Sequence, residues 1–141
     1  MTSTEPAAAT STELLVCTTC RPADAPREGQ AAGQGFFEQL EGAIAFAPGS
    51  APGPLLRGVA CLGACSHSCT VALQAPGKAS YVFGELAPED ECVQAVLEVA
   101  RQHAISTDGL LVWGQRPERL RRGLVARLPA MAARAGSEPD A

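Results

Sequence analysis

The chain has 141 residues, 46% of them hydrophobic, which is enough for one domain to bury a sizeable core without help from disulfides. Residues 1–115 hold 12 acidic and 5 basic residues, a net charge of −7, whereas residues 116–134 hold six arginines against Glu118, a net charge of +5. The acidic body argues against nucleic acid as a main partner, because binding to phosphates needs a net basic face.

Apolar spacing predicts an alternation of strands and helices along the chain. The expected strands are 13–17, 55–61, 70–73 and 80–83, and the expected main helices are 35–47 and 87–104. The first two strands, which end at Cys17 and Cys61, should run parallel because a helix connects them. The last two strands should form a hairpin around Pro76 and Gly77. This order predicts an α/β, thioredoxin-like two-layer sandwich with a mixed four-stranded sheet.

The arginine-rich segment 116–127 predicts a short C-terminal helix. Pro117 suits the first helical position, and leucines recur every four residues at Leu120, Leu124 and Leu128, so one apolar face should pack on the domain. The side chains expected on the other faces include Arg116, Arg119, Arg121 and Arg122. We expect them to fold back on the acidic body or to dock a redox protein partner, and a solvated helix face is the alternative.

The two ends of the chain, residues 1–12 and 130–141, are expected to be disordered tails, which leaves one domain at 13–129. Residues 1–12 lack the basic start and the apolar run of a secretory signal. No segment approaches the roughly 20 apolar residues of a transmembrane helix. We therefore expect a cytoplasmic protein without a membrane partner, and a homodimer is compatible with the sequence.

Five of the six cysteines cluster in two short motifs, "CTTC" and "CLGACSHSC". They are Cys17, Cys20, Cys61, Cys65 and Cys69. The residues around the last three, such as Gly63 and Ser66, are poor helix formers, so these thiols are expected on a loop. Sites in open α/β sheets form at the carboxyl ends of parallel strands, where both motifs begin. We therefore expect the five thiols and His67 to converge on a metal, with Cys92 left as a core residue inside its helix.

The stretch "CLGACSHSCTVALQAPGKASYVFGEL", followed by a helix with acidic residues at its start, resembles the second half of thioredoxin-like 2Fe-2S ferredoxins, including a subunit of respiratory Complex I. Over about residues 13–129, the motifs "CTTCR", "CLGACSHSCTVAL", "GKASYVFGEL" and "STDGLLVWGQRPERLRRGLVARLP" are also similar to an uncharacterised bacterial family of predicted metal-binding proteins, often encoded beside cobalamin-synthesis genes. The ferredoxin resemblance implies a thioredoxin-like fold and a 2Fe-2S cluster.

The same resemblance implies a set of ligands. They are Cys17, Cys61 and Cys65, with Cys20 as the fourth, while Cys69 and His67 are auxiliary candidates. Cys69 stands where the ferredoxins tend to have a proline, close to the first-strand cysteine, which leaves open whether Cys20 or Cys69 completes the set.

Three classes of function remain open. The first is a 2Fe-2S protein for electron transfer or sensing, in which loop amides donate hydrogen bonds to the sulfurs and Gly63 permits their close approach. The second is a protein that binds zinc or another divalent metal, through four thiolates or through Cys17, Cys20, Cys65 and His67. The third is a thiol oxidoreductase that uses "CTTC" as its exchanging pair. We find no catalytic constellation of other residues, so we do not expect an enzyme.

Overall fold

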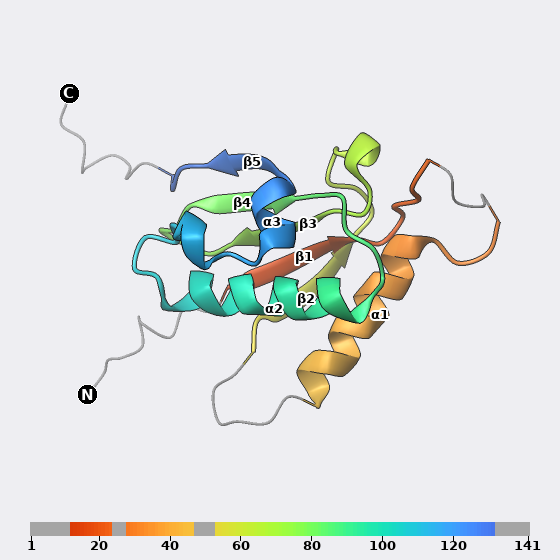
Figure 1. The fold of residues 1–141 in the computed structure, drawn as a ribbon, viewed down its shortest axis with the longest axis horizontal. Coiled ribbons are helices and arrows are strands. Elements are labelled where there is room, and N and C mark those ends of the chain that lie inside the picture. The colour runs from red at the N-terminus through yellow and green to blue at the C-terminus, as the bar shows by residue number, and fades with distance from the viewer. Residues whose placement is uncertain (1–11, 24–27, 47–52, 132–141) are drawn as a thin grey trace.

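A mixed sheet covered by helices on one face forms the body of the protein (Figure 1). The computed structural model describes residues 12–23, 28–46 and 53–131, except for the side chain of Cys65. The strands are β1 (Glu13–Cys17), β2 (Leu55–Val59), β3 (Val71–Gln74), β4 (Ser80–Phe83) and β5 (Leu124–Leu128), and the helices are α1 (Ala32–Ala45), α2 (Asp90–Ile105) and α3 (Glu118–Arg122). The strand order is β2-β1-β3-β4-β5, with β1 parallel to β2 and every other pair antiparallel.

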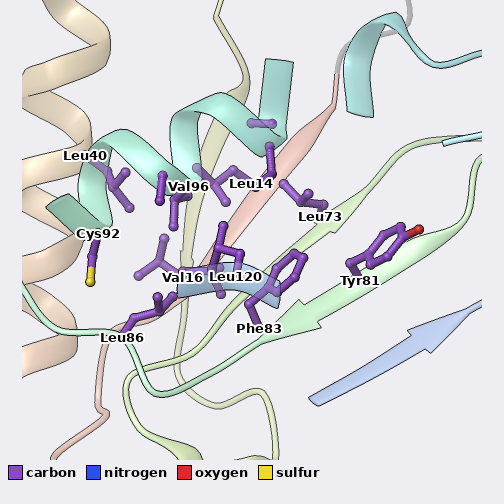
Figure 2. Packing of buried hydrophobic residues seen from close by; sticks show 14 of the residues in the cluster. Leu14, Val16, Leu40, Leu73, Tyr81, Phe83, Leu86, Cys92, Val96 and Leu120 are labelled. Atoms are coloured by element: carbon purple, nitrogen blue, oxygen red, sulfur yellow. The ribbon is translucent and has the colours of Figure 1, made fainter. Parts of the chain in front are cut away.

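The core lies between the helices and one face of the sheet. Leu14 and Val16 of β1 are fully buried, and the register places Leu73 and Val71 of β3 directly opposite them. Because side chains alternate between the two faces of a strand, these four residues form one apolar surface. Figure 2 shows α1, α2 and α3 packed on that surface, with the two aromatic residues of β4 in the same cluster. Its labelled members are Leu14, Val16, Leu40, Leu73, Tyr81, Phe83, Leu86, Cys92, Val96 and Leu120.

The predicted sandwich is confirmed, but the sheet has five strands where four were expected. The extra strand replaces part of the predicted helix 116–127, which ends at Arg122; residues Leu124–Leu128 instead pair antiparallel with β4. Leu120 is fully buried as expected, whereas Leu124 and Leu128 are 37% and 62% exposed. The free edge of β4 offers backbone hydrogen bonds that a continued helix would leave unused. The leucine spacing of four fits both structures, because residues four apart also share one face of a strand.

A buried histidine joins the start of the domain to α2 and to the hairpin. The Nε2 of His103 lies 2.7 Å from the carbonyl oxygen of Ala79, and its Nδ1 lies 2.7 Å from the hydroxyl of Thr12. A carbonyl can only accept, so Nε2 carries the proton and Nδ1 accepts from the hydroxyl. Thr12, which the sequence placed in a tail, is therefore held in the domain, and it is 1% exposed. The rest of that predicted tail and residues 132–141 lie outside the described residues.

We expect the protein to lose stability as the pH falls from 7 to 5, and His103 to be a main cause. Burial lowers the pKa of His103; the hydrogen bond to Ala79 opposes this in part, and nearby Lys78 adds a smaller lowering effect. The unfolded chain therefore takes up a proton near pH 6.5 while the folded chain does not, so the stabilisation present above that pH is lost below it. Denaturant unfolding of His103→Gln should show a flatter profile in this range. If the His103→Gln profile matches that of the wild type, His103 does not cause the effect.

Candidate metal centre

The two cysteine motifs meet at the carboxyl ends of β1 and β2, as the sequence predicted. Cys17 is the last residue of β1, and Cys61 follows the end of β2, which stops at Val59. The "CTTC" turn is fastened to β2, because both the backbone N–H and the hydroxyl of Thr18 donate to the carbonyl oxygen of Val59, at 2.9 and 3.2 Å. The hydroxyl of Thr19 donates to the carbonyl of Ala60. These bonds extend the parallel pairing and hold the turn in place.

Cys17 lies in a set of hydrogen-bond donors that favours its thiolate. Its side chain is 2% exposed, and burial alone raises its pKa. Hydrogen bonding with the Cys20 thiol and with Thr19, together with the backbone of Leu62, outweighs burial and holds the pKa of Cys17 below its usual value. The thiolate is the form that binds metals and attacks disulfides. Cys17 is therefore the cysteine whose surroundings most favour metal binding or attack on a disulfide.

Cys20 has the opposite character although it lies beside Cys17. Burial raises the pKa of Cys20, and the hydrogen bond with Cys17 raises it further. Hydrogen bonds with Thr70 and Ser68 lower this pKa but only partly offset the rise. Its sulfur lies 3.5 Å from the hydroxyl of Thr70, and the residue is 5% exposed. The two thiols of "CTTC" thus form an asymmetric pair, with the Cys20 thiol as donor and the Cys17 sulfur as acceptor.

Helix α1 supports this turn through close backbone packing. The backbone N–H of Gly33 donates to the carbonyl oxygen of Cys20 at 3.0 Å. A Cβ at position 33 would lie 2.0 Å from the carbonyl oxygen of Cys17, far inside any real contact. Only glycine at this position lets the first turn of α1 approach the cysteine turn so closely.

Cys61 lies on the loop that follows β2 and is exposed. Its sulfur accepts a hydrogen bond from the backbone N–H of Gly63 at 3.1 Å. Gly63 has a φ of 76°, a conformation that other residues adopt only with strain. A backbone amide hydrogen bond to a cysteine sulfur is therefore present at Cys61. Cys65 starts a turn of 3-10 helix, Cys65–His67, on the same loop, and its side chain is not described.

Cys69 and Cys92 are fully buried at the inner side of the same region. Burial, together with the nearby Cys20, Cys17 and Cys92, raises the pKa of Cys69 to about 12. Its backbone is fixed by a reciprocal pair of hydrogen bonds with Leu86, of 2.9 and 3.2 Å. Cys92, in the first turn of α2, was predicted to be a core residue, and Figure 2 shows it in the core cluster. Its closeness to the other thiols was not predicted, because helix spacing does not reveal what the helix start faces.

His67 points to a carboxylate in this conformation. Its Nδ1 lies 2.9 Å from Oε2 of Glu85, and both side chains are about half exposed. Among the residues whose side chains are described, no group of three cysteine, histidine or acidic side chains is arranged to hold a metal ion. The expected convergence of five thiols and His67 is therefore not seen among the described side chains. Cys17 and Cys20 lie together with Cys69 close to them, whereas Cys61 is exposed and His67 pairs with Glu85. Thr19 and Thr70 were not predicted as site residues, because their position next to cysteines is their only sequence signal.

A groove of about 1030 Å³ lies at the other end of the sheet. It is lined by the start of β1, the hairpin around Pro76 and the end of β5, and none of its lining residues is a cysteine or histidine. The cysteines of the candidate site therefore lie away from this groove, at the end of the sheet where β1 and β2 finish.

No helix in the described ranges is long and apolar enough to cross a membrane.

The β1-α1-β2 unit, the antiparallel hairpin and the α2 that follows it define a thioredoxin-like domain with a cysteine-rich edge. The chain belongs to the family described as "Protein of unknown function (DUF1636)", whose pattern matches residues 14–130. No curated protein matches the chain.

Two solved structures share the fold. Both are thioredoxin-like [2Fe-2S] ferredoxins from Aquifex aeolicus, each 18% identical to this chain with a TM-score of 0.50. One alignment covers 86% of this chain and 98% of the ferredoxin, and the other, with the wild-type ferredoxin, covers 82% and 97%. The expected likeness to an uncharacterised family with a thioredoxin-like fold is thereby confirmed.

Proposed function

We propose that the protein binds a 2Fe-2S cluster and serves in electron transfer or sensing, with Cys17, Cys61, Cys65 and Cys20 as ligands. The observation that carries the proposal is that the two cysteine motifs meet at the ends of β1 and β2. There the sulfur of Cys61 accepts the backbone N–H of Gly63 at 3.1 Å, and the backbone of Leu62 on the same loop helps to lower the pKa of Cys17. Amides aimed at ligand sulfurs stabilise the thiolates and raise the reduction potential of an iron-sulfur cluster.

The chemistry of the donor set fits such a cluster. Its four protein ligands must be thiolates, and the lowered pKa of Cys17 favours that form. Cys20 is less acidic but accepts hydrogen bonds that would stabilise its thiolate, whereas Cys69 lacks such support and has a pKa of about 12. A bound cluster would supply one-electron chemistry. A place in cobalamin metabolism, suggested by the sequence resemblance, belongs to the same proposal.

The test is the metal and sulfide content of the full chain. Protein isolated without oxygen from iron-replete cells should be brown and should contain iron and acid-labile sulfide in about equal amounts. On reduction it should give the electron paramagnetic resonance signal of a 2Fe-2S cluster. Stoichiometric zinc without sulfide under the same conditions would overturn the proposal in favour of a zinc protein.

A second candidate function, thiol-disulfide exchange, is favoured by the asymmetry of the "CTTC" pair. In such a reaction the Cys17 thiolate attacks a disulfide of a partner protein, forms a mixed disulfide and releases one partner thiolate. Cys20 then gives up its proton and attacks Cys17, which releases the second partner thiolate and leaves a Cys17-Cys20 disulfide. A partner disulfide is thereby reduced by two electrons while "CTTC" is oxidised.

This second function predicts a reversible disulfide in metal-free protein. Mild oxidation with glutathione disulfide should join Cys17 to Cys20, and peptide mapping should find this bond. Cys20→Ser should instead accumulate a mixed disulfide between Cys17 and glutathione, because the resolving thiol is missing. Cys92→Ser is the control, since it leaves "CTTC" intact and should still form the internal bond. Glutathione attached mainly to the exposed Cys61, with no Cys17-Cys20 bond, would exclude this function.

A further inference from the structure

A buried arginine without a counter-ion lies beneath the C-terminal part of the chain. Arg116 is 5% exposed, and it forms no ion pair with another described residue. Its Nε has no hydrogen-bond partner among the described residues. The guanidinium lies over the ring of Phe83, with Cζ 5.9 Å from the ring centre. A buried charge of this kind costs stability unless something else compensates it.

The groups around Arg116 add positive charge. Its pKa is lowered by burial, and the neighbouring groups that act on it are Tyr81, Arg121 and Arg127. Tyr81 is a neutral phenol at physiological pH, and its oxygen is occupied by a hydrogen bond from the backbone N–H of Leu111. Among the described residues, the groups that act on Arg116 include no carboxylate. In this part of the structure three arginines thus share one region without a described acidic partner.

An exposed tryptophan lies at the edge of these arginines. Trp113 is 63% exposed, and the guanidinium of Arg121 stacks over its ring at 4.9 Å. Arg121 also donates to the carbonyl oxygens of Trp113 and Gly114, so its position is fixed. Val112, next to Trp113, is 59% exposed. Exposed tryptophan and ordered arginine are the residue types enriched at binding hot spots between proteins.

We propose that Arg116, Arg121, Arg127 and Trp113, here called the arginine platform, dock an acidic segment of a partner protein. The charges of Arg116, Arg121 and Arg127 act on one another, so together they strengthen the positive potential at the exposed Arg127 and at Arg121. Carboxylates brought to this surface supply the compensation that the described part of the chain does not give Arg116. The segment 116–134 contains a single acid, Glu118, so its own side chains do not supply it.

Hydrogen bonds connect α3, which carries Arg121 of the platform, to the cysteine loop. Helix α3 lies between α2 and β5 (Figure 1) and carries Arg121 and Arg119. Arg119 donates to the carbonyl oxygen of Glu85 at 3.2 Å, and Glu85 in turn binds His67 on the cysteine loop. The backbone N–H of Gly84 also donates to the carbonyl of Gly123 at 2.7 Å. These bonds couple α3 to the cysteine loop, and a redox protein is the acidic partner that the proposed function would require, a part of the inference that rests on that function.

The test is binding of a fluorescein-labelled glutamate peptide to the full chain, measured by anisotropy at low salt, with an equally long glutamine peptide as reference. The glutamate peptide should bind saturably, more weakly at high salt, and should change the fluorescence of Trp113, the only tryptophan. Arg116→Met and Arg127→Gln should each weaken binding about tenfold. Arg57→Gln on β2, at the opposite edge of the sheet, is the control and should bind like the wild type.

A second measurement separates a docking role from a structural one. Because Arg116 is buried without a counter-ion, Arg116→Met should raise the melting temperature while it weakens peptide binding. A lower melting temperature with unchanged binding would make Arg116 a structural residue and overturn the inference. If Arg57→Gln lost binding equally, the effect would come from net charge alone and the docking inference would be wrong. If inorganic phosphate bound as tightly as the peptide, the arginine platform would be a small-anion site instead. Peptide binding is measured on protein with and without bound metal. A failure of the peptide to bind would therefore not count against the metal proposal, which is tested separately by iron and sulfide content.

Discussion

Cys17→Ser is expected to abolish the visible spectrum of the proposed iron-sulfur cluster, and the bound iron should fall to a small fraction of the wild-type value. A serine oxygen is a hard, weakly acidic replacement for a soft thiolate. The loss should be severe at this position because the surroundings of Cys17 lower its pKa and so favour the thiolate. The measurement is iron per chain and the absorption spectrum of protein isolated without oxygen.

The matched control for this experiment is Cys69→Ser. Cys69 is also fully buried and near the other thiols, but its pKa of about 12 and its fixed backbone make it a poor ligand. The Cys69→Ser protein should keep its cluster, with a changed potential or a shorter lifetime in air. If Cys69→Ser loses the cluster while Cys20→Ser retains it, the ligand set is Cys17, Cys61, Cys65 and Cys69, and "CTTC" contributes a single ligand.

Gly33→Ala is expected to destabilise the protein by about 3 kcal/mol and to disturb the site together with the fold. The added methyl group would meet the carbonyl oxygen of Cys17 at 2.0 Å and the backbone nitrogen of Cys20 at 3.0 Å. Both are backbone atoms, which cannot move aside without displacing the turn or the helix. Denaturant unfolding measures the loss of stability, and the metal content of the same protein reports on the turn.

Gly42→Ala, in the same helix, provides the control. A Cβ at position 42 has no other atom within 4 Å, apart from its chain neighbours and the helix backbone. Alanine there should stabilise the protein by about 0.5 to 1 kcal/mol, because it restricts the unfolded chain and favours the helix. If Gly33→Ala proved as stable as Gly42→Ala, the close packing of α1 against the cysteine turn would be disproved.

The sequence predicts the strands and helices well where the period of apolar residues agrees with a single structure. The strand 13–17 is β1 with the same bounds, and helix 87–104 corresponds to α2 with its start three residues later. The failure at the C-terminal segment has a physical reason, since the spacing of Leu120, Leu124 and Leu128 suits both a helix and a strand. The free edge of β4 determines that residues 124–128 form a strand. This edge is a tertiary feature, which the local spacing of leucines does not reveal.

The candidate site also has one part that the sequence predicts and one part that it does not. The position of Cys17 and Cys61 at neighbouring strand ends could be predicted, because parallel strands bring their carboxyl ends to one edge. The opposite acidities of Cys17 and Cys20 could not, since they depend on donors from distant parts of the chain, including Leu62 and Thr70. The pairing of His67 with Glu85 likewise requires the hairpin to be in place.

The thiols of the site are also part of the hydrophobic core, because Cys17, Cys20, Cys69 and Cys92 all belong to the same buried cluster as Phe36 and Leu86. A ligand held by these sulfurs would therefore brace α1, α2 and the strand ends at once. Its release should loosen the whole cysteine end of the sheet and speed amide hydrogen exchange there. An unloaded chain would then be a better substrate for proteases than a loaded one, so the cell could remove copies that fail to acquire their metal.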